Sequence, residues 1–176
     1  MKLKLYRLDN KSKEELQSRI DNLEKEQKER KLNFYTQSGK GLSVFTDPDT
    51  LFIERWYEQF GNQIDKKHEI EINADAKIWY SAKTQKEGDD GLKELQSHPQ
   101  FQSIVNDIQQ FWKECHENPS KKKIFKGYTL ECEQEEDRIL CEEACAFSII
   151  LKLLGYDLMM NENDSLILNA KIAHVL

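Results

Sequence analysis

The chain has 176 residues, of which 33% are charged and 38% hydrophobic, and its formal net charge is −6. A chain of this length fits one domain, and we place no domain boundary within residues 1–176. The negative net charge argues against general nucleic-acid binding, which depends on neutralising phosphates, and no apolar run is long enough to cross a bilayer.

The N-terminal segment alternates in polarity, which predicts a strand that carries Leu5 and Arg7 on one face. Its charged start is not typical of a secretory signal. Ser12 and Glu15 have the spacing of a capping box, and they predict the start of a highly charged helix over residues 13–31.

From residue 42 onward, short β-prone runs alternate with amphipathic helical runs. Short strands interspersed with helices, and a return to strand at the end of the chain, predict an α+β fold. The expected elements are a strand over 42–46, a helix from Pro48 to Gly61, strands over 68–72 and 77–80, a mobile loop over 82–91, a helix over 99–117, a strand over 124–133, a helix over 136–154, and strands over 165–169 and 171–176.

The last quarter of the chain carries the most informative pattern. A helix-like run stops at Leu154-Gly155-Tyr156-Asp157, a polar turn follows at 161–164, and a buried-looking strand begins at Ser165. This pattern, taken in order with earlier segments, resembles the ADP-ribosyltransferase-like superfamily. The earlier segments that carry the resemblance are Leu5-Tyr6-Arg7, Gly41 to Asp49, His68 to Ile72, and Ala76 to Ile78.

The resemblance implies a split β-sheet with flanking helices, here with a helical and acidic insertion at about residues 82–140. It implies that NAD binds between the two halves of the sheet as a substrate. It also implies that ADP-ribose passes to a macromolecular acceptor, for which we expect a protein.

The resemblance also implies which residues contact NAD. Arg7 offers a forked pair of donors to a phosphate or ribose oxygen, and Ser43 and Thr46 are expected beside the nicotinamide ribose. Two of the three have a structural alternative, since Arg7 can be a paired strand-end residue and Thr46 can cap a helix. Aromatic candidates for stacking on nicotinamide, which can equally be core residues, are Tyr6, Tyr35, Phe45 and Tyr80.

Cleavage of the bond to nicotinamide develops positive charge on the ribose, and a fixed carboxylate stabilises that charge. The position that matches the family glutamate is Ser165, which is a departure from the family pattern. We expect Asp164, and after it Glu162, to take the catalytic role. Alternatively, both belong to a polar turn and the site is inactive.

Four cysteines without a secretory signal indicate reduced thiols, and therefore a cytoplasmic protein or one delivered into a host cell. Their spacing lacks the close pairs of zinc sites, so we expect no metal. An alternative function is a catalytically inactive binding module that uses the helix over 13–31 or the acidic segment over 133–143. A further alternative is related chemistry, either NAD hydrolysis or phosphate removal from RNA ends.

Overall fold

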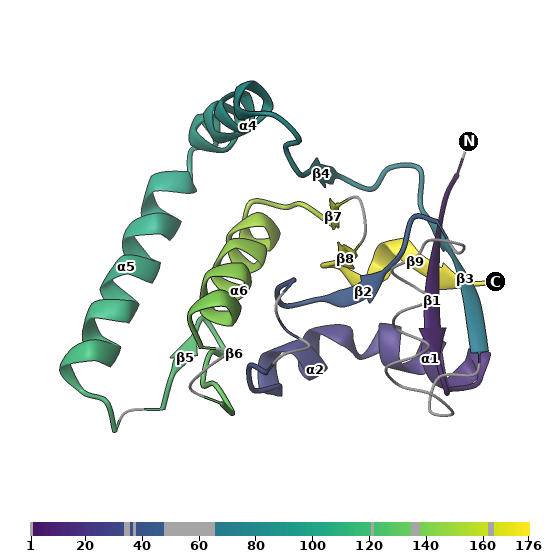
Figure 1. The fold of residues 1–176 in the computed structure, drawn as a ribbon, viewed down its shortest axis with the longest axis horizontal. Coiled ribbons are helices and arrows are strands. Elements are labelled where there is room, and N and C mark those ends of the chain that lie inside the picture. The colour runs from purple at the N-terminus through teal and green to yellow at the C-terminus, as the bar shows by residue number, and fades with distance from the viewer. Residues whose placement is uncertain are drawn as a thin grey trace.

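The computed structural model describes residues 2–33, 36, 38–47, 66–120, 122–134, 138–161 and 164–176. In this part of the chain the fold is α+β, as expected, with helices packed around two sheets and a small hairpin (Figure 1). The expected helix from Pro48 to Gly61 lies outside the described residues, and so do Tyr35 and Glu162.

The first sheet is antiparallel and has the strand order β1-β3-β9. Alternation along β1 buries Leu5 completely, which confirms the N-terminal strand. The expected strand over 171–176 is only partly present, because Ala170–Ile172 form a 3₁₀ turn, η4, that Asn169 caps. The strands of this sheet are β1 (Leu3–Asp9), β3 (Lys66–Ile72) and β9 (Ala173–Val175).

The second sheet has the strand order β2-β8-β7-β4, with β7 and β4 parallel and the other pairs antiparallel. Its strands are β2 (Leu42–Val44), β4 (Ile78–Tyr80), β7 (Leu158–Met160) and β8 (Ser165–Ile167). Strand β7 is absent from the sequence expectation, since three residues after a helix stop give no periodic signal. The two sheets meet where Tyr6 and Phe45 exchange backbone hydrogen bonds of 2.8 and 2.7 Å.

The charged helix expected over 13–31 is two helices, α1 (Lys13–Asp21) and α2 (Leu23–Glu29). The capping box at the start of α1 is confirmed, because the Ser12 hydroxyl accepts a hydrogen bond from the Glu15 backbone N–H. The helix breaks at Asn22, whose side-chain amide donates to the carbonyl oxygen of Ser18 at 2.8 Å. Such local side-chain bonds compete with a continuing helix.

The expectation of a loop over 82–91 is wrong, because this segment enters helix α4 (Gln85–Ser97). Thr84 caps α4 by accepting a hydrogen bond from the Glu87 N–H. A Cβ added to Gly91 would lie 3.0 Å from the Trp79 ring, so glycine here serves close packing. The next helix, α5 (Phe101–Glu117), confirms the amphipathic helix expected over 99–117.

The expected strand over 124–133 is instead a hairpin of β5 (Ile124–Phe125) and β6 (Tyr128–Thr129). Lys126 and Gly127 both have positive φ, 45° and 88°, which is the pattern of the tight type I′ turn. Helix α6 (Arg138–Leu153) follows and agrees with the helix expected over 136–154.

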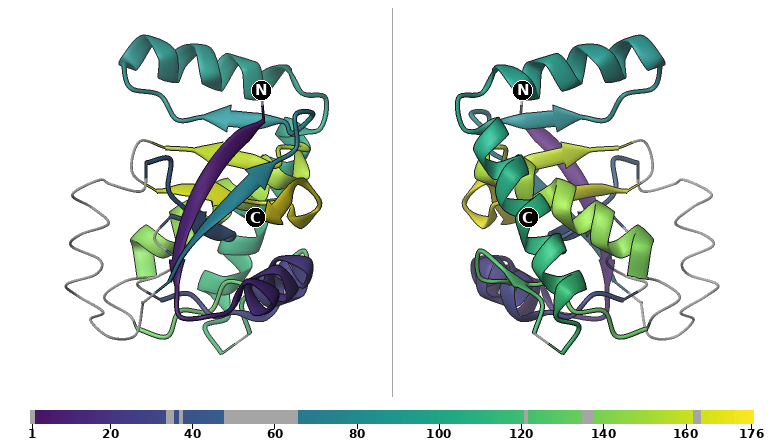
Figure 2. Two further views of the ribbon diagram at one scale, coloured as in Figure 1. Left: turned by 90° about the vertical axis from the view of Figure 1, so that its right-hand side faces the viewer. Right: turned by 90° about the vertical axis from the view of Figure 1, so that its left-hand side faces the viewer.

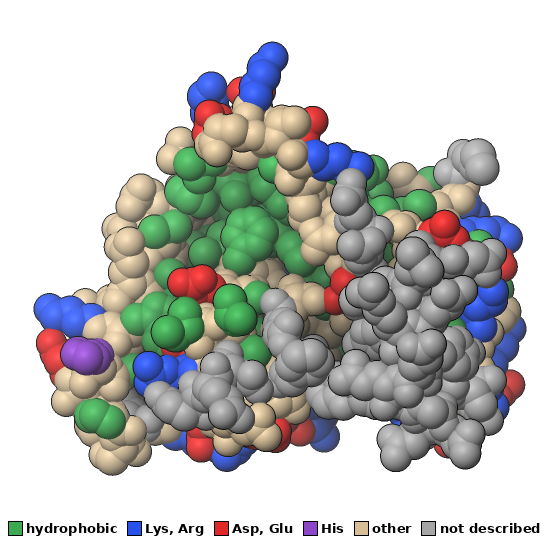
Figure 3. All heavy atoms as spheres, in the orientation of Figure 1, with side chains coloured by type: hydrophobic (Ala, Val, Ile, Leu, Met, Phe, Trp, Pro, Cys, Tyr) green, Lys and Arg blue, Asp and Glu red, His purple; other side chains and the backbone are tan. Residues whose placement is uncertain are grey.

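The elements form layers that Figures 1 and 2 show from three sides. Helix α6, with α5 beyond it, covers one face of the second sheet, and the first sheet lies toward the other face. Leu5, Val44 and Ile167 belong to one apolar cluster that joins both sheets. Figure 3 shows hydrophobic side chains gathered in a hollow beneath α4 and beside α5. Among the described helices, none has the length and apolar character needed to cross a membrane.

Candidate functional site

Arg7 lies on β1 with its guanidinium directed toward β2. Its Nε donates to Asp9 at 3.0 Å, and its Nη1 donates to the carbonyl oxygen of Ser43 at 2.7 Å. The side chain is only 16% exposed. Burial lowers the pKa of Arg7, and the nearby charge of Arg19 adds to this, while Asp9 opposes it. Arg7 is therefore a positioned cation, held by a carboxylate and a carbonyl at the junction of the sheets.

Asp164 immediately precedes β8, whose first residue, Ser165, pairs with Val44 of β2, so Asp164 lies at the end of β2 that leads into Phe45. Burial raises the pKa of Asp164 above its ordinary value. The pKa is lowered again by hydrogen bonds from the hydroxyls of Ser38 and Ser43, and to a smaller extent by the charge of Arg7. The Ser38 hydroxyl donates to Oδ2 of Asp164, whereas Oδ1 is buried and has no hydrogen-bond partner among the described residues.

Three of the residues expected to form the site are thus neighbours in space. Arg7 comes from β1, Ser43 from β2 and Asp164 from the turn before β8. Arg7 contacts Ser43 directly, and both influence the ionisation of Asp164. The arrangement places a cation, a hydroxyl and a carboxylate of raised pKa in one small region.

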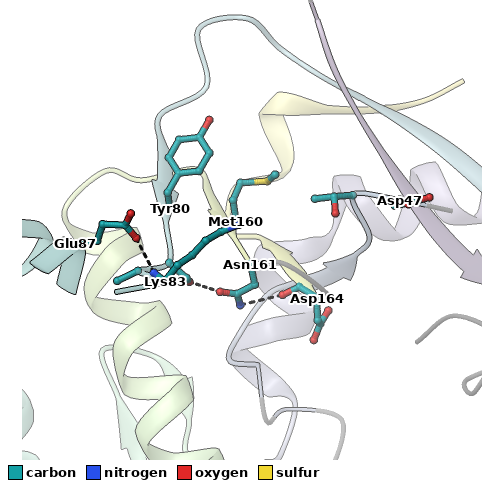
Figure 4. Close-up of a pocket in the computed structure, with 10 residues that line it drawn as sticks. Asp47, Tyr80, Lys83, Glu87, Met160, Asn161 and Asp164 are labelled. Atoms are coloured by element: carbon teal, nitrogen blue, oxygen red, sulfur yellow. Dashed lines mark hydrogen bonds between the residues drawn. The ribbon is translucent and has the colours of Figure 1, made fainter. Parts of the chain in front are cut away.

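An open pocket of about 1190 Å³ extends from Asp164 along the ends of β2, β4 and β7 (Figure 4). In Figure 4 the Asp164 carboxylate points away from Tyr80 and Lys83. The Glu87 carboxylate accepts a hydrogen bond of 2.8 Å from the Lys83 backbone N–H. The described residues that line the pocket are Thr46, Asp47, Tyr80, Ser81, Ala82, Lys83, Glu87, Met160, Asn161 and Asp164.

Ser165, which was expected to occupy the position of the superfamily glutamate, has a structural role. Its hydroxyl accepts a hydrogen bond of 3.1 Å from the Asn161 N–H and donates one of 3.2 Å to the Asn161 carbonyl oxygen. The Asn161 side chain donates to the Asp164 carbonyl oxygen at 3.0 Å and accepts a hydrogen bond from the Ser81 hydroxyl. These bonds fix the turn that presents Asp164.

The remaining expected contacts are spread over several places. Thr46 and Tyr80 line the pocket, and Tyr80 is 67% exposed. Phe45 is buried. Tyr6 neighbours Arg7 on β1, so its side chain points to the opposite face of the strand. Its ring lies 6.0 Å from the Lys67 Nζ.

Sequence reasoning missed Ser38, Asp9 and Lys40. Ser38 and Asp9 bond directly to Asp164 and Arg7, yet neither stands in a recognisable motif. Lys40 is buried and donates a hydrogen bond to the carbonyl oxygen of Arg30. Burial lowers the pKa of Lys40 to about 8, and burial raises the pKa of the nearby Cys145 thiol to about 12. Only the folded chain brings these groups together.

Comparison of the chain with models of protein families, with curated proteins and with solved structures gives no match.

Proposed function

We propose that this protein is an ADP-ribosyltransferase that uses NAD as its substrate and modifies a protein acceptor. The observation that supports this most strongly is the convergence of Arg7, Ser43 and Asp164, which come from three separate segments. Arg7 and Ser43 are the cation and the hydroxyl that the resemblance to the superfamily assigns to NAD, and Asp164 is the acid expected to replace the family glutamate, whose position is held by Ser165. The proposal takes the junction of the two sheets at Tyr6 and Phe45 as the place where the split sheet of that superfamily would open.

In this proposal the dinucleotide lies at the junction of the two sheets, with its nicotinamide ribose beside Asp164. Arg7 supplies a fixed positive charge for the pyrophosphate or a ribose oxygen. Asp9 and the Ser43 carbonyl hold the guanidinium in place before the ligand arrives. Such preorganisation lowers the free-energy cost of binding.

The bond between C1′ of the ribose and N1 of nicotinamide breaks, and its electron pair leaves with nicotinamide, which becomes neutral. The Asp164 carboxylate stabilises the positive charge that develops on the ribose. A nucleophilic atom of the acceptor then bonds to C1′ and loses its proton to Asp164 or to water. The raised pKa of Asp164 favours the carboxylate as a proton acceptor.

The test is nicotinamide release from NAD, combined with calorimetric titration of NAD. The wild type should bind and consume NAD. Arg7→Ala should lose NAD binding, whereas Asp164→Ala should keep binding and lose turnover by about a hundredfold or more, the range for removal of one electrostatic group. Asp75→Ala, which removes an exposed carboxylate in a turn, is the matched control. Unchanged NAD consumption in both site variants would refute these assignments.

The products separate the related activities. Labelled ADP-ribose that becomes attached to protein supports the transferase, and release of free ADP-ribose alone would make the protein an NAD hydrolase. NAD binding without turnover in the wild type would indicate an inactive binding module.

A further inference from the structure

Strand β4 forms an edge of the second sheet. The Ser81 N–H donates to the Met160 carbonyl at 2.9 Å, and the Lys77 carbonyl accepts from Asp157 at 2.8 Å. Alternate residues of a strand face the same neighbour, so Ile78 and Tyr80 direct their backbone N–H and C=O groups away from β7. No other described segment hydrogen bonds to these groups.

Two other strand edges of the fold are closed. On β9, the Val175 N–H donates to the side-chain oxygen of Gln17 from α1 at 2.8 Å. Next to β2, Phe45 exchanges backbone hydrogen bonds with Tyr6. Proteins usually block exposed edges, because unpaired backbone groups pair readily with another chain. Unlike these two edges, the β4 edge has no hydrogen bond from another described segment to its outward backbone groups.

A groove of about 290 Å³ runs between β4 and α4. Figure 2 shows α4 alongside β4, beyond the rest of the sheet. The α4 wall contributes Glu87, Asp90 and Glu94, which are spaced three and four residues apart and so share one side of the helix. The β4 wall contributes Ile78, Trp79 and Tyr80, none of them charged. The groove thus combines open backbone groups on one wall with carboxylates on the other, of which Asp90 also pairs with Lys93 at 3.4 Å and Glu94 accepts a hydrogen bond from the Tyr156 hydroxyl.

We propose that this groove binds an extended, basic segment of the protein acceptor as an additional strand on β4. Backbone pairing with Ile78 and Tyr80 supplies affinity, and arginine or lysine side chains of the segment meet the carboxylates of α4. The identification of this partner as the acceptor rests on the proposed function. Tyr80 and Glu87 line both this groove and the pocket that Asp164 also lines, so a segment bound on β4 would lie next to that pocket.

Binding is tested without NAD, by fluorescence anisotropy with an eight-residue peptide of alternating arginine and valine. Asp90→Lys should weaken binding about tenfold, because it reverses a charge that faces the peptide. Asp89→Lys is the matched control, since Asp89 lies on the same helix but does not line the groove, and it should bind as the wild type does. A peptide with N-methyl groups on one edge, which cannot pair with a strand, should bind far more weakly.

Amide hydrogen exchange gives a second readout, because the bound peptide should protect the amides of Ile78 and Tyr80. Equal binding of a glutamate–valine peptide, or of the N-methylated peptide, would overturn the proposal. So would a dimer in solution that Asp90→Lys dissociates, because the groove would then hold a second copy of the chain.

The binding assay also keeps the two proposals distinguishable. Peptide binding without NAD consumption would refute the proposed function and leave the groove as a peptide site. NAD consumption without peptide binding would refute the proposal that the groove binds a peptide, and would leave the proposed function standing. Asp90→Lys should leave NAD hydrolysis in the absence of acceptor unchanged.

Discussion

The Arg7 guanidinium donates a 2.7 Å hydrogen bond to the carbonyl oxygen of Ser43, and this contact joins the two sheets beside Asp164. Because the acceptor is a backbone atom, any residue at position 43 preserves the bond. Arg7→Lys should not preserve the site in full, since lysine lacks the fork that bonds Asp9 and Ser43 together. The pair therefore links the architecture of the fold directly to the proposed NAD site.

The hydroxyl of Ser38 should set the pH dependence of turnover. It donates to the Asp164 carboxylate and lowers the pKa of that group against the effect of burial. Ser38→Ala removes the donor, so the pKa of Asp164 should rise and the acid limb of the pH–rate profile for nicotinamide release should move to higher pH. Ser97→Ala on α4 is the control. An acid limb that stays in place or moves to lower pH would contradict this role for Ser38.

Asp164 should reduce the stability of the fold at neutral pH. Its folded pKa is raised, so the folded state holds a proton that the unfolded state releases, and stability falls as pH rises from the ordinary value of 3.8 through the folded pKa. Asp164→Asn should therefore stabilise the protein at pH 7, because the amide has nearly the same shape as the carboxylate and places no charge in the buried position. Denaturant unfolding should show the difference vanishing below the ordinary pKa. A destabilised variant at pH 7 would count against this burial of the carboxylate.

Lys40 should produce the opposite dependence at alkaline pH. Burial lowers its pKa from 10.5 to about 8, so in this interval the unfolded state binds more protons. The contribution of Lys40 to the free energy of unfolding should consequently rise as pH increases from about 8 to 10.5, while the raised pKa values of Cys145, Tyr128 and Tyr156 act in the opposite direction in the upper part of this interval. Lys40→Met should remove this rise, whereas substitution of the exposed Lys93 by Met should retain it. Thermal unfolding measured across this pH interval tests the prediction. If stability changed with pH by the same amount in the wild type and in both variants, Lys40 would not have the proposed effect.

Gly39 should be costly to replace, because its backbone conformation and its surroundings both disfavour a side chain. It has φ of +117°, and an added Cβ would lie 2.7 Å from the Ser148 hydroxyl and 2.9 Å from the Ala144 carbonyl oxygen. Gly39→Ala should destabilise the protein by about 2 kcal/mol or more, from backbone strain and overpacking together.

Two other glycines provide controls for this steric argument. Gly155 has φ of +84° and open space, so Gly155→Ala should cost only the strain of about 1 kcal/mol. Gly88 lies within α4 with its nearest contact at 3.7 Å, and Gly88→Ala should stabilise the protein by about 0.5–1 kcal/mol. Denaturant unfolding of the three variants measures these changes in the free energy of unfolding. If Gly39→Ala were no more destabilising than Gly155→Ala, Ser148 and Ala144 would have to move aside to admit the new methyl group.

Much of the fold follows from local sequence patterns. The β1 alternation, the Ser12 capping box and the amphipathic α5 were predictable, because each depends on residues close together in the chain. The hairpin at Lys126–Gly127 and helix α4 were mispredicted. In α4, glycines and aspartates favoured a loop, but the Thr84 cap and packing against Trp79 favour the helix.

The candidate site was less accessible to sequence reasoning. Arg7, Ser43 and Asp164 were named from motif order, and their proximity depends on strand pairing that only the fold defines. Ser38 and Asp9 carry no sequence signal, because their roles come from contacts across loops and strands.

The most direct measurement is a crystal structure of the protein with a non-hydrolysable NAD analogue. We expect the nicotinamide ribose beside the Asp164 carboxylate, and the Arg7 guanidinium bonded to a pyrophosphate or ribose oxygen. An analogue bound away from both residues, or none bound at a concentration that saturates NAD-consuming enzymes, would contradict it.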